Sequence, residues 1–395
     1  MGIKLSQRVT GIKSSPTLAV AARAAKLRAA GRDIIGLGAG EPDFDTPDHI
    51  KSAAIQAIND GMTKYTAVDG TPSLKEAIVE KFNRENGLSY ALSQVLVSCG
   101  CKHSFYNMAQ ALLNPGDEVI IPAPYWASYP DMIRLAGGEP VIIKASLEHD
   151  FKIDPQRLQA AITEKTKLLV LNSPANPTGA YCSAKELASL GEILHANPHV
   201  LIASDDMYEH ILWGDQSFCN IVNVCPDLHE RTIVLNGVSK AYAMTGWRIG
   251  YAAGPEELIR AMKRIQSQST SNPTSIAQAA AQTALEGDQS FISERCNIFK
   301  ERHDFVYKKL NEINGITCLP SQGTFYIFPS MQGVIERLDE VHNDIELAEF
   351  ALDKAGIAMV PGSAFGAPGH MRISFATSMD ALERAMDRLA TSLSA

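Results

Sequence analysis

The chain has 395 residues, of which 45% are hydrophobic and 20% are charged. This length suggests two domains, or one large domain with a smaller one attached. The apolar content is that of a globular protein and excludes disordered, collagen-like and low-complexity chains. The net charge of −8 argues against nucleic acid as a partner, because nucleic-acid binding relies on clustered positive charge.

Cysteine usage indicates a reducing compartment. The seven cysteines are an odd number without the spacing of a disulfide framework. Only Cys99 and Cys101 lie close in sequence, and no second pair completes four zinc ligands, so we predict no metal. No apolar run approaches the roughly 18–20 residues of a membrane span, so no membrane partner is expected.

The first 32 residues contain several basic residues and no acidic one, which would suit a transit peptide. Residues 18–32 suit an ordinary amphipathic helix equally well. We therefore treat the segment as part of the mature chain and expect a cytoplasmic protein.

Short apolar segments alternate with helical segments along the middle of the chain. The predicted strands are residues 95–98, 118–122, 139–144, 167–172, 200–204, 232–236 and 247–252. Helical patterns lie between most of them, for example at residues 102–113, 183–196 and 256–268. Several strands are continuous runs of Val, Ile and Leu, which is typical of a sheet covered on both faces. The sequence therefore predicts an α/β fold with a mainly parallel sheet between helices.

The pattern changes beyond residue 289. A long helical segment at residues 291–312 is followed by apolar strands and shorter helices. The predicted strands are residues 323–328, 358–361 and 371–375, and the predicted helices are residues 345–355 and a last one from residue 379. This order indicates a smaller α+β domain that begins near the acidic turn at residues 286–288.

Functional side chains follow the predicted strands, and ligands of open α/β sheets bind at the carboxyl ends of the strands. The segments at these ends are Gly100–Lys102, Tyr125–Trp126, Asn172–Gly179, Asp205–Tyr208, and Lys240 with Arg248. They offer hydrogen-bond donors, an aromatic plane, a carboxylate, a phenol and an amine. This set suits an aromatic, phosphorylated, nitrogen-containing cofactor better than a metal or an acyl-enzyme.

The segment Gly237-Val-Ser-Lys240, followed by Arg248, is the most specific motif. A lysine can hold an aldehyde as a Schiff base, and an arginine can clamp a phosphate. Each residue alone could be a surface lysine or a strand arginine. Together they resemble the lysine signature of the class I pyridoxal-phosphate aminotransferases. The resemblance extends from about residue 5 to residue 389, with the motifs in the family's order.

The resemblance assigns Asn176, Asp205 and Tyr208 to the cofactor ring. It implies that Asn176 and Tyr208 reach the phenolic oxygen, and that Asp205 faces the pyridine nitrogen. A carboxylate there keeps the nitrogen protonated, and a protonated ring is the electron sink for a substrate carbanion. Taken alone, Asn176 is equally consistent with a turn and Asp205 with a helix N-cap.

The phosphate site implied by the resemblance is Gly100, Cys101 and Lys102, at the N-terminus of a helix that favours anions, with Arg248. Many relatives have glycine where Cys101 stands, but a backbone N–H does not require glycine. Trp126 resembles the residue that stacks on the ring. Tyr65 resembles the tyrosine that reaches the neighbouring subunit's cofactor, which implies a homodimer with shared active sites, although a locally packed loop tyrosine is an alternative.

Substrate recognition requires a partner for an α-carboxylate, and Arg372 matches the family's carboxylate-binding arginine. Gly40 matches the loop over the substrate. Its glycine-rich segment lacks the third spaced glycine of a dinucleotide site and leads into Pro42, so a nucleotide is rejected. The resemblance places Trp126 and Asn176 at the substrate as well.

The aspartate-specific bacterial branch of the family has a lysine at the position of Lys102, which pairs with the distal carboxylate. Lys13 stands where relatives that also use prephenate have a lysine, although a solvated lysine is an alternative. We therefore expect reversible amino transfer from L-aspartate to 2-oxoglutarate by a ping-pong mechanism, with Lys240 as general base and acid. The partners are small amino acids and 2-oxo acids. Prephenate as a further acceptor, another class I aminotransferase and a carbon–sulfur lyase on the same cofactor remain open.

The resemblance also implies fold type I of the pyridoxal-phosphate-dependent transferases. We expect residues 1–45 to form an N-terminal arm and part of the small domain, residues 46–288 the large cofactor-binding domain, and residues 289–395 the C-terminal small domain. A transcription regulator with an aminotransferase-like domain is disfavoured, because the match begins almost at residue 1, where a DNA-binding domain would be needed.

Overall fold

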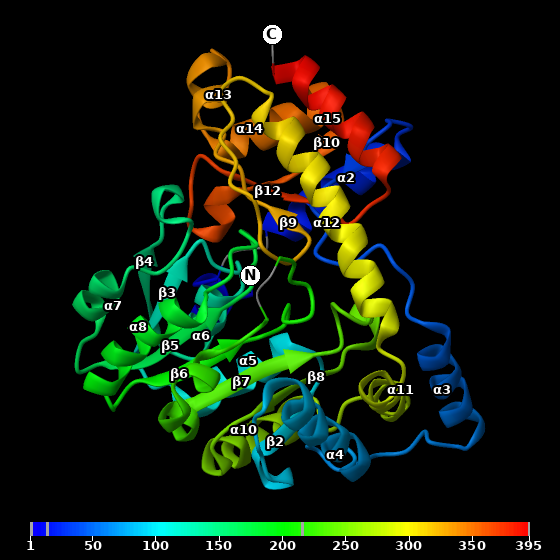
Figure 1. Ribbon diagram of the computed structural model, residues 1–395, viewed down its shortest axis with the longest axis vertical. Helices are drawn as coiled ribbons and strands as arrows, with labels where there is room; N and C mark the ends of the chain where they lie inside the picture. The colour runs from blue at the N-terminus through cyan, green and yellow to red at the C-terminus, as the bar shows by residue number, and fades with distance from the viewer. Residues whose placement is uncertain (1–2, 13–15, 215–216, 394–395) are drawn as a thin grey trace.

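The computed structural model describes residues 3–12, 16–214 and 217–393 (Figure 1). A seven-stranded sheet forms the large part of the molecule, and a three-stranded sheet lies beyond it, beside the long helix α12. Helix α12 (Ser290–Asn311) connects these two regions. The predicted Lys13 lies outside the described residues.

The large sheet has the strand order β2-β8-β7-β6-β5-β3-β4. Strands β4, β3, β5, β6 and β7 are mutually parallel, whereas β8 is antiparallel to both of its neighbours. The bounds are β2 (Val95–Ser98), β3 (Glu118–Ala123), β4 (Glu139–Lys144), β5 (Thr166–Asn172), β6 (Leu201–Asp205), β7 (Thr232–Gly237) and β8 (Gly250–Ala253). The predicted α/β class with a mainly parallel sheet is confirmed.

The continuous apolar runs are explained by helices on both faces. In β5, Leu168 and Val170 belong to one hydrophobic cluster, and Leu169 and Leu171 belong to a second cluster on the other face. The first cluster includes residues of α5 (Cys101–Leu112), α6 (Tyr129–Leu135) and α10 (Glu256–Ser269). The second includes residues of α3 (Asp48–Asn59), α4 (Pro72–Lys81), α8 (Ala184–Ala196) and α11 (Ser275–Glu286). Because successive strand residues point to opposite faces, every position must be apolar.

Helix α8 illustrates how local sequence sets an element's start. The Ser183 hydroxyl accepts from the Glu186 N–H at 3.4 Å, and the Glu186 carboxylate accepts from the Ser183 N–H at 2.8 Å. This capping box satisfies free donors at the helix end. The shorter helices of the large part are α7 (Pro155–Ala161) and α9 (Ile221–Val224).

The second part contains two small sheets. Strands β11 (Val360–Pro361), β12 (Met371–Ser374) and β9 (Tyr326–Ile327) are antiparallel, and β1 (Ile35–Gly36) pairs in parallel with β10 (Ile357–Ala358). The remaining helices are α1 (Gln7–Thr10), α2 (Pro16–Ala29), α13 (Gln332–Arg337), α14 (Asp344–Phe350) and α15 (Met379–Leu393). The β1–β10 pair joins the N-terminal segment to this part, and the three predicted domain ranges stay a prediction.

Three predicted strands were too long. The strand predicted at 358–361 is interrupted at Met359, where the chain changes its pairing partner from β1 to β12. The strand predicted at 323–328 begins only at Tyr326, because Thr324 has a left-handed φ of 66°. The strand predicted at 247–252 begins at Gly250, because Arg248 has a φ of 57°.

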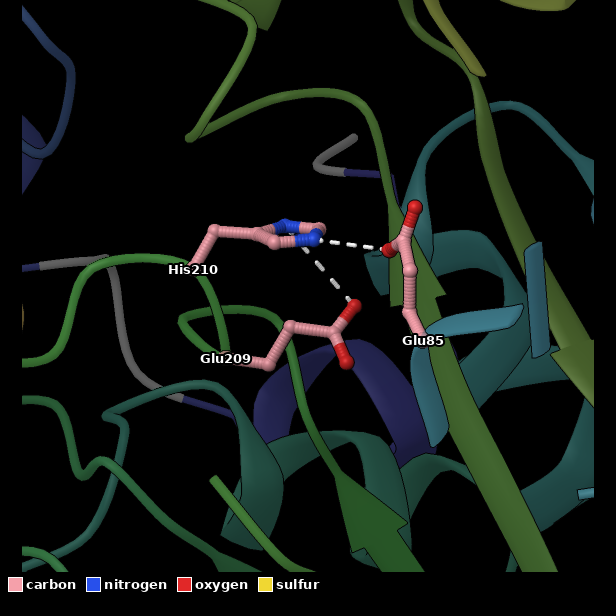
Figure 2. A group of neighbouring side chains, drawn as sticks. All are labelled: Glu85, Glu209 and His210. Atoms are coloured by element: carbon pink, nitrogen blue, oxygen red, sulfur yellow. Dashed lines mark hydrogen bonds and ion pairs between the residues drawn. The ribbon is translucent and has the colours of Figure 1, made fainter. Parts of the chain in front are cut away.

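A cluster of charged side chains around the buried Glu209 supports the segment after β6 (Figure 2). His210 Nε2 lies 2.9 Å from Glu85 Oε2, and His210 Nδ1 lies 3.8 Å from Glu209 Oε1. The fully buried Lys81 ammonium contacts Glu209 and donates to Asn86 Oδ1 at 2.8 Å. Burial alone would raise the pKa of Glu209, but Lys81 holds this pKa below its usual value. The cluster is therefore a compensated ion-pair network.

We expect Lys81→Met to lower the free energy of unfolding by about 3–5 kcal/mol, because it leaves the Glu209 carboxylate buried without its cation. Urea denaturation at fixed protein concentration measures this change. Lys300→Met, which removes an exposed pair with Asp304 at 2.6 Å, is the control and should cost at most about 1 kcal/mol. Equal stability of the two variants would contradict this account.

Candidate active site

A cavity of about 360 Å³ opens at the carboxyl ends of β5, β6 and β7. Most of the predicted site residues meet there. The lining includes Gly40, Cys101, Lys102, Trp126, Asn176, Asp205, Tyr208, Lys240, Arg248 and Arg372. Gly100 is the N-cap of α5, next to the lining residue Cys101. The parallel strands explain this convergence, because their carboxyl ends share one edge of the sheet.

The N-terminus of α5 and the Arg248 guanidinium form an anion cradle. Arg248 Nη1 donates to the Thr245 carbonyl at 2.9 Å, and Nη2 lies 3.3 Å from the Cys99 carbonyl. At Gly100, which has a φ of 86°, an added Cβ would lie 2.2 Å from Arg248 Nη2. Only glycine therefore lets the guanidinium approach the helix N-terminus, where unpaired N–H groups favour a phosphate.

Lys240 is held by a backbone carbonyl and surrounded by other charges. Its Nζ donates to the Gly40 carbonyl at 2.5 Å. Burial lowers the pKa of Lys240 to about 8, and the cations Arg372 and Arg248 add to this shift. A much larger fraction of this amine is therefore neutral, and able to attack an aldehyde, than of a solvated lysine at neutral pH.

Asp205 ends β6 on the floor of the cavity. One carboxylate oxygen accepts from the Tyr129 hydroxyl, and the other accepts from the Met207 N–H at 3.3 Å. Burial raises the pKa of Asp205 to about 6, although these donors and Lys240 oppose the rise. A cationic ring nitrogen beside this carboxylate would favour its charged form further.

Arg372 and Asn176 meet on the opposite side of the cavity. Arg372 Nη1 donates to Asn176 Oδ1 at 3.0 Å, and Nη2 donates to the Gly38 carbonyl at 2.8 Å. Its guanidinium lies 4.5 Å from the centroid of the Tyr326 ring. The buried Nε atom has no hydrogen-bond partner in the described part of the chain. This orphaned donor leaves Arg372 with capacity for a carboxylate ligand.

Lys102 also lines the cavity, with Nζ 4.9 Å from the centroid of the Trp126 ring. Within the described residues Lys102 forms no ion pair, and burial lowers its pKa. The cavity therefore offers an uncompensated cation at a second point, besides Arg372.

Tyr65 is not at the cavity of its own chain, because its side chain is on the surface and 91% exposed. Sequence reasoning missed Tyr129 and Tyr326, which both line the cavity. Tyr129 begins α6 three residues after Trp126, and its N–H donates to the Trp126 carbonyl at 3.0 Å, so its place in the segment after β3 could have indicated it. Tyr326 pairs with Ser374 across β9 and β12, a long-range contact without a local sequence signal.

Among the described residues, one group of three side chains has metal-ligand spacing: Glu85, Glu209 and His210. Lys81 already contacts both carboxylates, so a cation would have to displace its ammonium. The group therefore carries no metal-site assignment. No helix in the described part of the chain combines the length and the apolar character that crossing a membrane requires.

Together these features define a class of site. An anion cradle, a largely desolvated amine, a buried carboxylate and an aromatic wall fit a phosphorylated pyridine aldehyde. Gly100–Lys102 and Arg248 would hold its phosphate, Asp205 would face its nitrogen and Lys240 its aldehyde.

Comparison with known proteins identifies the family. A family model for aminotransferases of class I and II matches residues 32–389. An aspartate/prephenate aminotransferase of Nitrosomonas europaea is 58% identical over 397 residues, covering 99% of this chain and 100% of the relative. An aspartate aminotransferase of Geobacillus stearothermophilus is 49% identical over 387 residues, covering 98% of each chain. The crystal structure of the aspartate aminotransferase from Rhizobium meliloti has a TM-score of 0.96 at 48% identity, over 100% of this chain and 99% of that chain.

The chain therefore belongs to the class I and II aminotransferases, which are pyridoxal-phosphate-dependent transaminases. The predicted resemblance, the cofactor and fold type I are confirmed.

In the cofactor-free chain, we expect acylation of Lys240 to have a midpoint near pH 8. Its burial lowers the pKa, so the amine is protonated and unreactive below this pH and becomes reactive above it. Solvated lysines, with a pKa of about 10.4, are the internal control and stay mostly unlabelled at pH 8. Peptide mass spectrometry after pulse labelling measures each site. A Lys240 midpoint near that of the other lysines would contradict the burial argument.

Proposed function

We propose that this enzyme transfers the amino group of L-aspartate to 2-oxoglutarate. The observation that carries the proposal is the pair of cations Arg372 and Lys102 in one cavity with Lys240, because a dicarboxylic substrate needs two separate positive partners. Relatives at 49–58% identity are named aspartate or aspartate/prephenate aminotransferases. A solved aspartate aminotransferase from Thermus thermophilus, 42% identical, contains the dicarboxylate maleate.

Bound pyridoxal phosphate would supply the electron sink for the carbanion at the substrate Cα. The chain contributes the positioning and the charge. In this proposal Asp205 would keep the ring nitrogen charged, and Asn176 and Tyr208 would donate to the phenolic oxygen. Trp126 would stack on the ring, and an offset contact of this kind contributes about 0.5–1.5 kcal/mol beyond area burial.

Lys240 Nζ carries the proton in the proposed reaction. The amine takes the proton from the substrate Cα as general base and later gives it up as general acid. Its pKa of about 8 suits both roles near neutral pH. The first 2-oxo acid leaves before the second binds, so the overall kinetics are ping-pong.

Arg372 holds the α-carboxylate, Lys102 holds the distal carboxylate, and the loop at Gly40 lies over the substrate in this proposal. An uncharged side chain would leave the Lys102 ammonium without a partner, which disfavours alanine and tyrosine as donors.

We also propose prephenate as a second acceptor. The relatives from Nitrosomonas europaea and Cereibacter sphaeroides, 58% and 54% identical, are named for it. A larger cavity of about 820 Å³ adjoins the first and shares Lys102, Ala127 and Ser128 with it. This space would accommodate an acceptor with a ring. Lys13 is proposed as a substrate-binding residue for prephenate, and this role rests on the family resemblance alone.

Steady-state kinetics with aspartate, alanine, tyrosine and kynurenine test the donor. We expect Lys102→Gln to lower kcat/KM for aspartate about 10–100-fold, because a hydrogen bond between charged groups contributes about 1.5–3 kcal/mol. The same variant should raise kcat/KM for alanine or leave it unchanged, because it removes the unpaired cation. Lys240→Ala should abolish turnover with every donor. A preference of the parent enzyme for alanine or kynurenine would refute the proposal, and pyruvate release from β-substituted substrates would favour a lyase.

We propose that the enzyme is a cytoplasmic homodimer with shared active sites. The seven free thiols support a reducing compartment. Exposed Tyr65 and two exposed isoleucines of α3, Ile55 and Ile58, support a subunit interface on this side of the chain. Tyr65 of the partner subunit would then reach the phosphate beside Arg248.

We expect Tyr65→Phe to weaken pyridoxal-phosphate binding about 10–100-fold, because it removes one hydrogen bond to a charged group. Hybrid dimers with Lys240→Ala chains provide the decisive measurement. In a hybrid, the intact Lys240 belongs to the Tyr65→Phe chain and receives Tyr65 from the other chain. Cofactor affinity at that site should return to the parent value, and failure to recover would contradict a shared site.

A further inference from the structure

The loop between β1 and α3 supplies backbone oxygens to two cations of the site. The Gly38 carbonyl accepts from Arg372 Nη2 at 2.8 Å, and the Gly40 carbonyl accepts from Lys240 Nζ at 2.5 Å. The position of this loop therefore sets the direction of the guanidinium and of the amine.

An ion pair anchors the loop to α12. Arg302 Nη1 and Nη2 donate to the two oxygens of Asp43 at 2.7 and 2.9 Å. The Arg302 side chain is 10% exposed, whereas the Asp43 side chain is 28% exposed. A bidentate contact of this kind fixes orientation as well as distance, which a single surface ion pair does not.

The neighbouring Phe44 is packed against the same helix. Its ring centroid lies 5.3 Å from that of Phe299, at an interplanar angle of 67°. The guanidiniums of Arg295 and Arg302 lie 4.9 and 5.4 Å from the Phe44 centroid. Buried Phe299 in turn contacts Phe325, at 5.4 Å between ring centroids, and Lys240 Nζ lies 6.0 Å from the Phe325 ring. Packing is thus continuous from the anchor to the amine.

The other side of the loop is tied to the segment after Lys240. Thr245 Oγ1 donates to Glu41 Oε2 at 2.8 Å, and Thr46 Oγ1 donates to the Ala243 carbonyl at 2.6 Å. These contacts hold the loop from the lysine side only. On the α12 side, the polar contacts are the Asp43–Arg302 pair and the donation of Arg295 Nη2 to the Asp45 carbonyl at 2.7 Å.

We propose that Asp43 and Arg302 are positioning residues for substrate binding. Neither lines the cavity, and both act through the loop that aligns Arg372 and Lys240. This inference rests on the proposed function for its substrate. Asp43 and Arg302 thereby align Arg372 for the substrate α-carboxylate, and their role is not one in overall folding.

The test compares Asp43→Asn, which keeps the shape but removes the charge, with Glu312→Gln, which makes the same change in the exposed Lys309–Glu312 pair near the end of α12. In the Asp43→Asn holoenzyme we expect KM for aspartate and the calorimetric Kd for maleate, an unreactive dicarboxylate, to rise about tenfold. We expect kcat to change less than about twofold. Arg302→Lys, which keeps the charge but loses the bidentate fork, should give a smaller rise.

Hydrogen exchange of residues 37–46 provides a second measurement that needs no substrate. We expect it to accelerate in Asp43→Asn and not in Glu312→Gln. Unchanged exchange, or a loss of thermal stability with unchanged KM and maleate Kd, would overturn the proposal. If the parent enzyme itself ignores aspartate and maleate, the proposed function fails, while the exchange measurement still decides whether Asp43 and Arg302 fix the loop.

Discussion

The whole site depends on keeping one amine, Lys240 Nζ, out of water beside other cations. Burial and the nearby Arg372 and Arg248 lower the pKa of Lys240 to about 8, while burial raises the pKa of Asp205 to about 6. The two groups are thereby poised on either side of neutral pH, as acid–base chemistry at that pH requires. The remaining excess of positive charge in the cavity, from Arg248, Arg372 and Lys102, makes it a site for anionic ligands.

The sheet topology builds this arrangement from segments far apart in sequence. Parallel strands β5, β6 and β7 deliver Asn176, Asp205 and Lys240 to one edge, each on the segment that follows or ends its strand. Arg248 precedes β8, which runs antiparallel to β7, so it returns to the same edge from the opposite direction. Arg372 comes from β12 of the second part and closes the cavity from the far side.

The sequence could predict the sheet and the residues at its carboxyl edge, because continuous apolar runs and strand-end motifs are local signals. It could not predict Tyr326, whose position depends on the antiparallel register of β9 with β12. The Asp43–Arg302 ion pair could not be predicted either, because its two residues lie 259 positions apart in the sequence. The predicted strand bounds were wrong at Thr324 and Arg248, where the backbone leaves the extended conformation. They were also wrong at Met359, where the strand changes its pairing partner. These are properties of long-range packing, which overrides local propensity.

Cys101 shows which positions of the phosphate cradle constrain the sequence. Its thiol is buried and burial raises its pKa, so it adds no charge to the cradle, and its backbone N–H remains at the start of α5. The positions that have no room for a side chain are its neighbours, Gly100 and Gly250. An added Cβ at Gly100 would lie 2.2 Å from Arg248 Nη2, and one at Gly250 would lie 2.1 Å from the Cys101 nitrogen. The glycines of this region are thus required by the approach of β8 and Arg248 to the helix. A backbone N–H donor at position 101 does not itself require glycine, so the buried Cys101 side chain packs in the core instead.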